Sequence, residues 1–111
     1  MLFENSPFNI LNTVFKNLYP NKRYRAFFDF EMKDENGEQV FGATQFNEDD
    51  VPYIFIDVGL SIKDAIEIFA HELAHVAVGI DNGHGKEWEI AFSDIQEEYN
   101  KLGEKLQNGE L

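Results

Sequence analysis

Two histidines and a glutamate occur at a spacing that suits metal chemistry. His71, Glu72 and His75 lie in the sequence H-E-L-A-H, within the largely apolar stretch 66–78. On a helix, residues four apart leave the same face one turn apart, so the two imidazoles can hold one tetrahedral metal ion. Glu72 projects to the side of the pair, where it can reach a metal-bound water without being a ligand. The spacing therefore predicts two nitrogen ligands and a nearby general base.

The residues around this motif indicate a buried helix. Apolar side chains occupy nearly every face between residues 66 and 78, which is typical of a core helix. Surface histidines, or histidines bonded within a core, are the alternative interpretation. Burying two imidazoles and a carboxylate without partners would cost considerable free energy. A bound metal ion, with the carboxylate facing a water-filled cleft, removes that cost.

A third ligand is needed, and the only other histidine, His84, follows His75 by nine residues. Gly79 favours a helix end, and the Asp-Asn-Gly sequence at 81–83 favours a turn. Together they can bring His84 back over the two helical histidines. His71, His75 and His84 would then hold the ion and leave the fourth position for water, as a catalytic zinc site requires.

Three acidic residues are alternative third ligands. Asp81 could bind zinc, although aspartate before Asn-Gly is typical of a turn. Glu97 or Glu98 could act as the distant glutamate of thermolysin-like enzymes, although such a run of acids is usually a solvated helix face. The metzincin spacing is not matched, because it requires glycine at 78 and histidine at 81, where this chain has valine and aspartate.

With H-E-x-x-H at 71–75 and H-G-x-x-W at 84–88, the chain resembles the SprT-like zinc metallopeptidases over a segment of 18 residues. The resemblance implies a zincin fold, with Zn²⁺ held by His71, His75 and His84. It also implies that Glu72 takes a proton from the zinc-bound water. Some members of this group degrade proteins crosslinked to DNA. This chain has no cysteines for a zinc ribbon and no basic tail.

Length and composition favour one compact domain spanning residues 1–111. Nine basic and twenty-one acidic residues give a net charge of −12. Such a surface repels phosphate backbones and anionic membranes, so we expect neutral or basic protein partners and no nucleic acid. The absence of cysteine excludes disulfides and thiolate metal sites. The sequence shows no secretion signal and no membrane-spanning stretch, so we expect a soluble cytoplasmic protein.

Three helices are predicted. Ser6 and Pro7 mark the start of an N-terminal helix that ends before Pro20. Ser61, with Asp64 three residues later, opens the helix that carries the H-E-x-x-H motif. A long C-terminal helix is expected from about 86 to 106, where apolar residues recur at alternating spacings of four and three.

Three strands are expected between the first two helices. Alternation from 24 to 33, the Asn36-Gly37 turn and the segment 40–46 predict a hairpin. The apolar segment 53–58 predicts a third, more buried strand. We therefore expect an α+β, minimal zincin-like domain with a mainly antiparallel three-stranded sheet.

The function that this pattern predicts is zinc-dependent peptide-bond hydrolysis with Glu72 as general base. An extended substrate could add to a sheet edge, either 53–58 or 40–46. Tyr53 and Tyr99 are candidate donors to the transition state, although each could equally be a core aromatic. Two other classes remain open: a zinc-binding domain that no longer cleaves, and a metal-free acidic domain that binds a protein partner.

Overall fold

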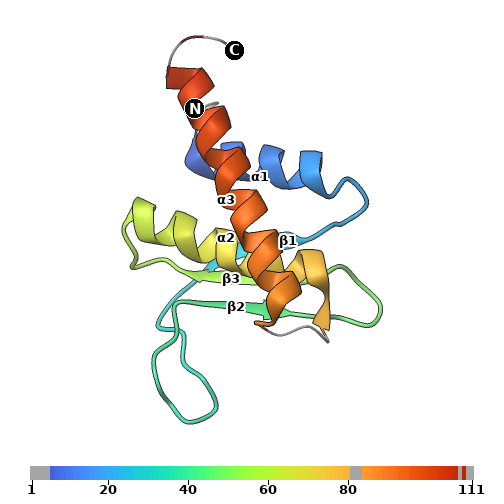
Figure 1. Cartoon of the computed structure of the whole chain (residues 1–111). Coiled ribbons are helices and arrows are strands. Elements are labelled where there is room, and N and C mark those ends of the chain that lie inside the picture. Colours follow the sequence, from blue (N-terminus) through green and yellow to red (C-terminus); the bar gives the residue numbers. More distant parts are fainter. Residues whose placement is uncertain (1–5, 81–83, 108, 110–111) are drawn as a thin grey trace.

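The computed structural model describes residues 6–80, 84–107 and 109, and has the α+β architecture expected from the sequence (Figure 1). Helix α2 packs against strands β2 and β3, and helices α1 and α3 pack on α2. The elements in chain order are α1 (Pro7–Leu18), β1 (Arg25–Asp29), β2 (Gly42–Gln45), β3 (Tyr53–Asp57), α2 (Ile62–Val78) and α3 (Lys86–Gln107).

The predicted starts of α1 and α2 and the predicted end of α2 are confirmed, and each carries a local signal that needs no distant partner. Ser6 caps α1 by accepting a hydrogen bond from the Phe8 amide over 3.3 Å. Ser61 caps α2 in the same way, with the Asp64 amide 3.1 Å away. Gly79 ends α2 with φ of 89°, a left-handed conformation that glycine adopts without steric cost. None of the helices in the described ranges is long and apolar enough to cross a membrane.

The predicted strand pairing is wrong, although the predicted turn forms. The strand order is β1-β3-β2, with β1 parallel and β2 antiparallel to β3. The sheet is therefore mixed and not mainly antiparallel. Around Asn36-Gly37 the chain does turn, with Gly37 at φ 80° and an isolated antiparallel bridge between Lys33 and Gln39. Beyond that bridge the two arms separate, and β3 lies between them.

Burial explains this order. Strand β3 carries Ile54 and Ile56, which are 0% and 3% exposed, so the strand gains most by having a neighbour on each side. All five residues of β1 are exposed, as suits an edge strand. Strand β1 is also shorter than predicted, since Glu31 has a φ of 48°, a conformation that strands do not contain.

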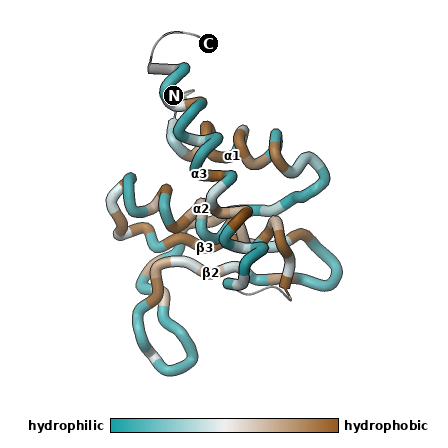
Figure 2. The backbone as a smooth tube through the Cα atoms, viewed as in Figure 1, coloured by the Kyte–Doolittle hydropathy of each residue, from teal (hydrophilic) through white to brown (hydrophobic). Residues whose placement is uncertain are grey.

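The core forms along α2, between the sheet and the other two helices. Leu73 and Ala74 of α2 are fully buried, together with Phe15 of α1 and Ile95 of α3. In Figure 2 hydrophobic segments meet at this centre, whereas the tip of the loop between β1 and β2 is hydrophilic and projects from the body. The apolar stripes predicted for α1 and α3 thus bury themselves against α2.

Strand β2 approaches α2 so closely that one position requires glycine. A Cβ at Gly42 would lie 2.3 Å from Ile68 Cγ2 and 3.2 Å from Glu72 Oε2. We therefore predict that Gly42→Ala lowers the free energy of unfolding by about 1–3 kcal/mol, as overpacking does elsewhere. Urea denaturation measures this change.

A matched control is Gly103→Ala, because a Cβ at Gly103 would meet nothing within 4 Å. That change should stabilise α3 by about 0.5–1 kcal/mol. Combining Gly42→Ala with Ile68→Ala should cost less than the sum of the two single changes, since the second removes the clashing atom. Parent-like stability of Gly42→Ala would show that the close approach is not required.

Candidate metal centre

Three imidazoles converge on one point of the surface. His84 Nε2 lies 3.0 Å from His75 Nε2 and 3.0 Å from His71 Nε2, and the three ligand atoms all lie within 4.8 Å of one another. Nitrogens bound tetrahedrally to one zinc-sized ion would be about 3.3 Å apart. The return of His84 onto the helical pair, predicted from the sequence, is confirmed. His71, His75 and His84 could therefore bind a metal ion.

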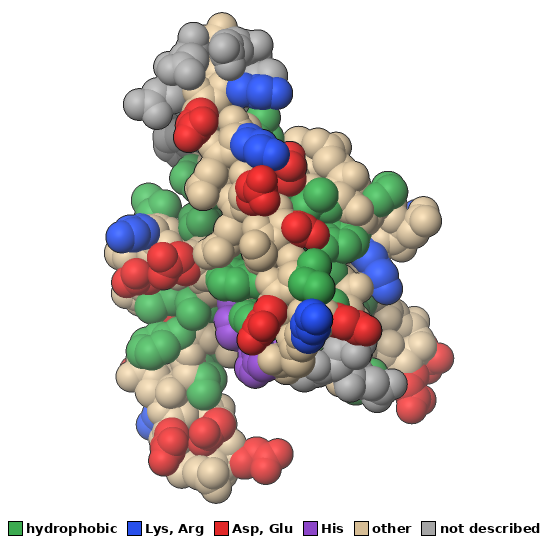
Figure 3. Space-filling view, in the orientation of Figure 1, with side chains coloured by type: hydrophobic (Ala, Val, Ile, Leu, Met, Phe, Trp, Pro, Cys, Tyr) green, Lys and Arg blue, Asp and Glu red, His purple; other side chains and the backbone are tan. Residues whose placement is uncertain are grey.

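Each ligand position follows from local structure. The pitch of α2 places His71 and His75 on one face, with ring centroids 5.2 Å apart. After α2 ends at Gly79, His84 comes two residues before α3 begins and brings its ring to 4.6 Å from that of His75. His84 is exposed and the helical pair is half-buried. The histidines thus reach the surface, as Figure 3 shows in purple, and one side of the centre stays open.

Trp88 forms an aromatic wall behind the histidines. Its ring lies 4.6 Å from His71, 4.8 Å from His84 and 5.6 Å from His75, measured between centroids. Its indole Nε1–H donates a hydrogen bond to the His71 carbonyl over 3.2 Å. The ring of Phe92 stacks on the indole, with 5.0 Å between the centroids. Trp88 is only 9% exposed, so this side of the three histidines faces a buried aromatic ring.

Glu72, the residue after His71 on α2, is buried and is held by a hydroxyl. It is 6% exposed, and Thr44 Oγ1 donates to its Oε1 over 2.8 Å. Burial raises the pKa of Glu72, and the Thr44 hydrogen bond partly opposes that rise. The histidine group, as found among the described residues, does not include Glu72. Glu72 is therefore not one of the candidate ligands, and its role as a general base stays a prediction.

Sequence reasoning missed Thr44 and Gly42. Both lie on the face of β2 that meets α2, two residues apart, as the period of a strand requires. A glycine and a threonine in this spacing form a weak signal, because small and hydroxyl residues are common in exposed strands. Glu72 follows Thr44 by 28 residues, so only the folded chain reveals the pair.

The alternative third ligands do not join the histidines where the structure describes them. Glu97 and Glu98 instead face Lys101, with carboxylate-to-amine distances of 3.4 and 3.3 Å. They belong to a solvated helix face, which was the other sequence-based interpretation. Asp81 lies outside the described residues.

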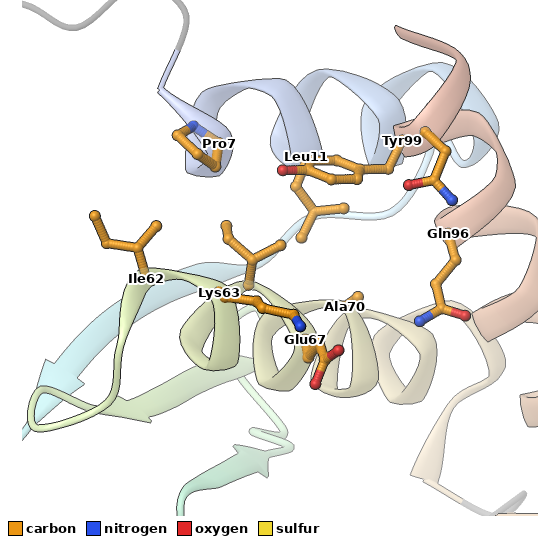
Figure 4. Close-up of a pocket in the computed structure, with 10 residues that line it drawn as sticks. Pro7, Leu11, Ile62, Lys63, Glu67, Ala70, Gln96 and Tyr99 are labelled. Atoms are coloured by element: carbon orange, nitrogen blue, oxygen red, sulfur yellow. The ribbon is translucent and has the colours of Figure 1, made fainter. Parts of the chain in front are cut away.

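Neither candidate tyrosine is brought to the histidines. The Tyr53 hydroxyl donates to the Asp50 carboxylate, and its ring contacts Phe27. Tyr99 lines a cavity of about 550 Å³ between the three helices, together with Leu11 and Ala70 (Figure 4). Beyond one another, the described ring neighbours of the three histidines are Trp88 and Phe92.

Burial and mutual repulsion keep the helical imidazoles neutral near pH 7. Burial, followed by the neighbouring His84 and His71, lowers the pKa of His75 from 6.5 to about 4. Burial and then His84 also lower the pKa of His71. Neutral imidazole is the form that binds metal, so both side chains are ready as ligands over the whole neutral range.

Metal binding is the first prediction from this geometry. Zinc titrated into chelator-treated protein should bind at one ion per chain and change the fluorescence of Trp88, the only tryptophan. His84→Ala should weaken affinity by more than about 100-fold, beyond the usual effect of residues outside the ligand set. Glu97→Gln, Glu98→Gln and Asp81→Asn are the controls and should bind as the parent does. Loss of the ion in Asp81→Asn alone would assign the third ligand to aspartate.

The lowered pKa of His75 predicts a pH dependence of the metal-free protein. In the unfolded chain His75 takes up a proton near pH 6.5, whereas in the folded chain it does so only near pH 4. The contribution of neutral His75 to the free energy of unfolding is therefore fully present above pH 6.5. It falls as the pH drops from 6.5 towards 4. Urea denaturation in the presence of chelator should show a shallower fall for His75→Gln than for the parent. Equal slopes would contradict the prediction.

Comparison with protein family models, curated proteins and solved structures finds no match to this chain.

Proposed function

We propose that the protein is a zinc-dependent peptidase of the SprT-like kind. The observation that supports this most is the convergence of three imidazole nitrogens, together with a buried carboxylate, Glu72, next to His71 on the same helix and not one of the ligands. A domain that only binds metal needs the histidines and has no need of Glu72. Peptide hydrolysis needs both, since the water must be held and its proton removed.

The donor set fits zinc. Three neutral imidazoles suit Zn²⁺ and leave a fourth position for water or substrate, whereas a purely structural zinc site is usually closed by four protein ligands. The chain has no cysteine that could supply a thiolate. Bound at His71, His75 and His84, zinc would lower the pKa of a coordinated water towards about 7 and polarise the scissile carbonyl.

Glu72 then performs the proton transfers. Its carboxylate accepts a proton from the attacking water and passes it to the nitrogen of the departing amine, so that the C–N bond breaks without an expelled amide anion. Its burial at 6% exposure favours proton uptake, because a buried carboxylate is less stable in its charged form. The inner side of the histidines faces the buried ring of Trp88.

Strand β2 is the better candidate for holding an extended substrate. The sequence offered two candidate edge strands for the substrate, 53–58 and 40–46. The first of these forms β3, which is the central strand and not an edge. Strand β2 lies at an edge and touches Glu72 through Thr44. A peptide added to β2 by main-chain hydrogen bonds would therefore pass close to the proposed base.

The charge of the surface favours neutral or basic substrate segments. Acidic side chains gather on the loop between β1 and β2, which projects below the histidines in Figure 3. The loop after β2 adds Glu48, Asp49 and Asp50. With a net charge of −12 the protein should attract cationic peptides and repel nucleic acid.

Glu72→Gln tests the proposed mechanism. The amide keeps the shape of the side chain and can still accept the Thr44 hydrogen bond, but it cannot act as a base. The variant should retain zinc and its melting temperature, and its rate of peptide cleavage should fall by about 10²–10⁴-fold, the usual contribution of a general base. Cleavage of a diverse peptide library, read by mass spectrometry, provides the assay and the sequence preference.

Glu97→Gln is the matched control, because that carboxylate lies on the exposed face of α3. Adding DNA should leave the rate unchanged. A Glu72→Gln variant that cleaves as fast as the parent would rule out the mechanism. Zinc binding without any cleavage would favour the alternative function, a silent zinc domain that binds a protein partner.

A further inference from the structure

A single hydrogen bond in the described part of the chain reaches the Glu72 carboxylate, and it comes from the edge strand. Thr44 Oγ1 donates to Glu72 Oε1 over 2.8 Å. The same hydroxyl oxygen lies 3.4 Å from the Glu72 carbonyl oxygen, which is too far to compete for its one proton. Thr44 itself is held in register opposite Ile54 of β3. A rigid element therefore presents the hydroxyl to the carboxylate.

The second carboxylate oxygen, Oε2, lies over strand β2. No buried side-chain oxygen or nitrogen of the described residues lacks a hydrogen-bond partner. Glu72 Oε2 accepts no hydrogen bond from the described residues. It lies over Gly42, where a Cβ would approach it to 3.2 Å. Strand β2 thus binds Oε1 through the Thr44 hydroxyl, and the missing side chain of Gly42 leaves space next to Oε2.

A general base must be held within hydrogen-bond distance of the water that it deprotonates. A free glutamate side chain has several rotatable bonds and samples many positions. Helix α2 fixes the backbone of Glu72, but it does not fix the outer torsions of the side chain. The contact with Thr44 selects one in which Oε1 is occupied and Oε2 is open.

We propose that Thr44 is a positioning residue for the peptidase reaction. Its hydroxyl holds Glu72 Oε1 so that Oε2 accepts the proton of the attacking water and returns it to the leaving amine. This role rests on the proposed function, because it has meaning only if Glu72 acts as a base. Thr44 belongs to the strand proposed to receive the substrate, so one element would align both the peptide and the base.

The test compares Thr44→Val, which keeps the shape of the side chain and removes the hydroxyl, with Thr44→Ser, which keeps the hydroxyl. In zinc-loaded protein Thr44→Val should lower kcat by about 10- to 100-fold, the usual effect of losing a residue that orients a catalytic group. KM and zinc content should stay near the parental values, because the hydrogen bonds of the Thr44 hydroxyl in the described residues go to Glu72 and not to a histidine. Thr44→Ser should restore most of kcat. Thr13→Val is the control, since Thr13 is the only other threonine and is exposed on α1.

A double-mutant cycle keeps the test independent of cleavage. If the contact exists in solution, Thr44→Val should destabilise the parent but have little effect in a Glu72→Leu background. Thr44→Ala replaces Thr44→Val in both assays if the valine variant does not fold. An active parent with an equally active Thr44→Val variant would overturn the positioning role, as would a fall in kcat that Thr44→Ser does not reverse. An inactive parent would instead reject the proposed function, and the positioning role with it.

Discussion

Helix α2 is the most buried helix of the protein, and it can hold polar side chains only if each finds a partner. Leu73 and Ala74 face the core at 0% exposure. His71, Glu72 and His75, on either side of them in the sequence, are the polar residues of this turn of the helix. A buried polar group without a partner costs about 1–3 kcal/mol. Strand β2, the segment before α3 and the first turn of α3 all supply partners to this part of α2, and their placement around it follows from this requirement.

Helix α3 links the candidate metal centre to the core. Its first turn contributes Trp88, which donates to the His71 carbonyl, and His84 lies just before it. Two turns later Ile95 is fully buried against the same core as Leu73. The packing that stabilises the fold therefore also sets the position of the third histidine. An ion bound by these imidazoles would in turn stabilise the folded state, because the unfolded chain does not hold the three ligands together.

The order of the strands decides which edge lies beside the base. Strand β3 is central because both of its isoleucines are buried, and this leaves β2 with one unpaired edge. Unpaired edges invite further strands, and proteins usually protect them. Here the edge strand also contacts Glu72, so its exposure has a use in the proposed reaction. Strand β1, at the opposite edge, lies beyond β3.

The sequence by itself determined the features that depend on neighbouring residues. The serine caps, the glycine at the end of α2 and the helical spacing of His71, Glu72 and His75 need no contact beyond a few residues. The three-helix, three-strand layout follows from periodicity in the same way. The sequence also proposed His84 as the third ligand, but it left Asp81, Glu97 and Glu98 as alternatives, because chain spacing does not say where a loop returns.

Only the tertiary structure decided the relations between distant segments. The Asn36-Gly37 turn predicted a hairpin, yet β3 lies between the two arms. Pairing on both sides of the apolar strand β3 outweighs the local preference for a hairpin. The contact of Thr44 with Glu72 spans 28 residues, and the need for glycine at 42 arises from Ile68 on another element. Local propensity cannot encode such contacts, since their free energy is realised only when the sheet packs against α2.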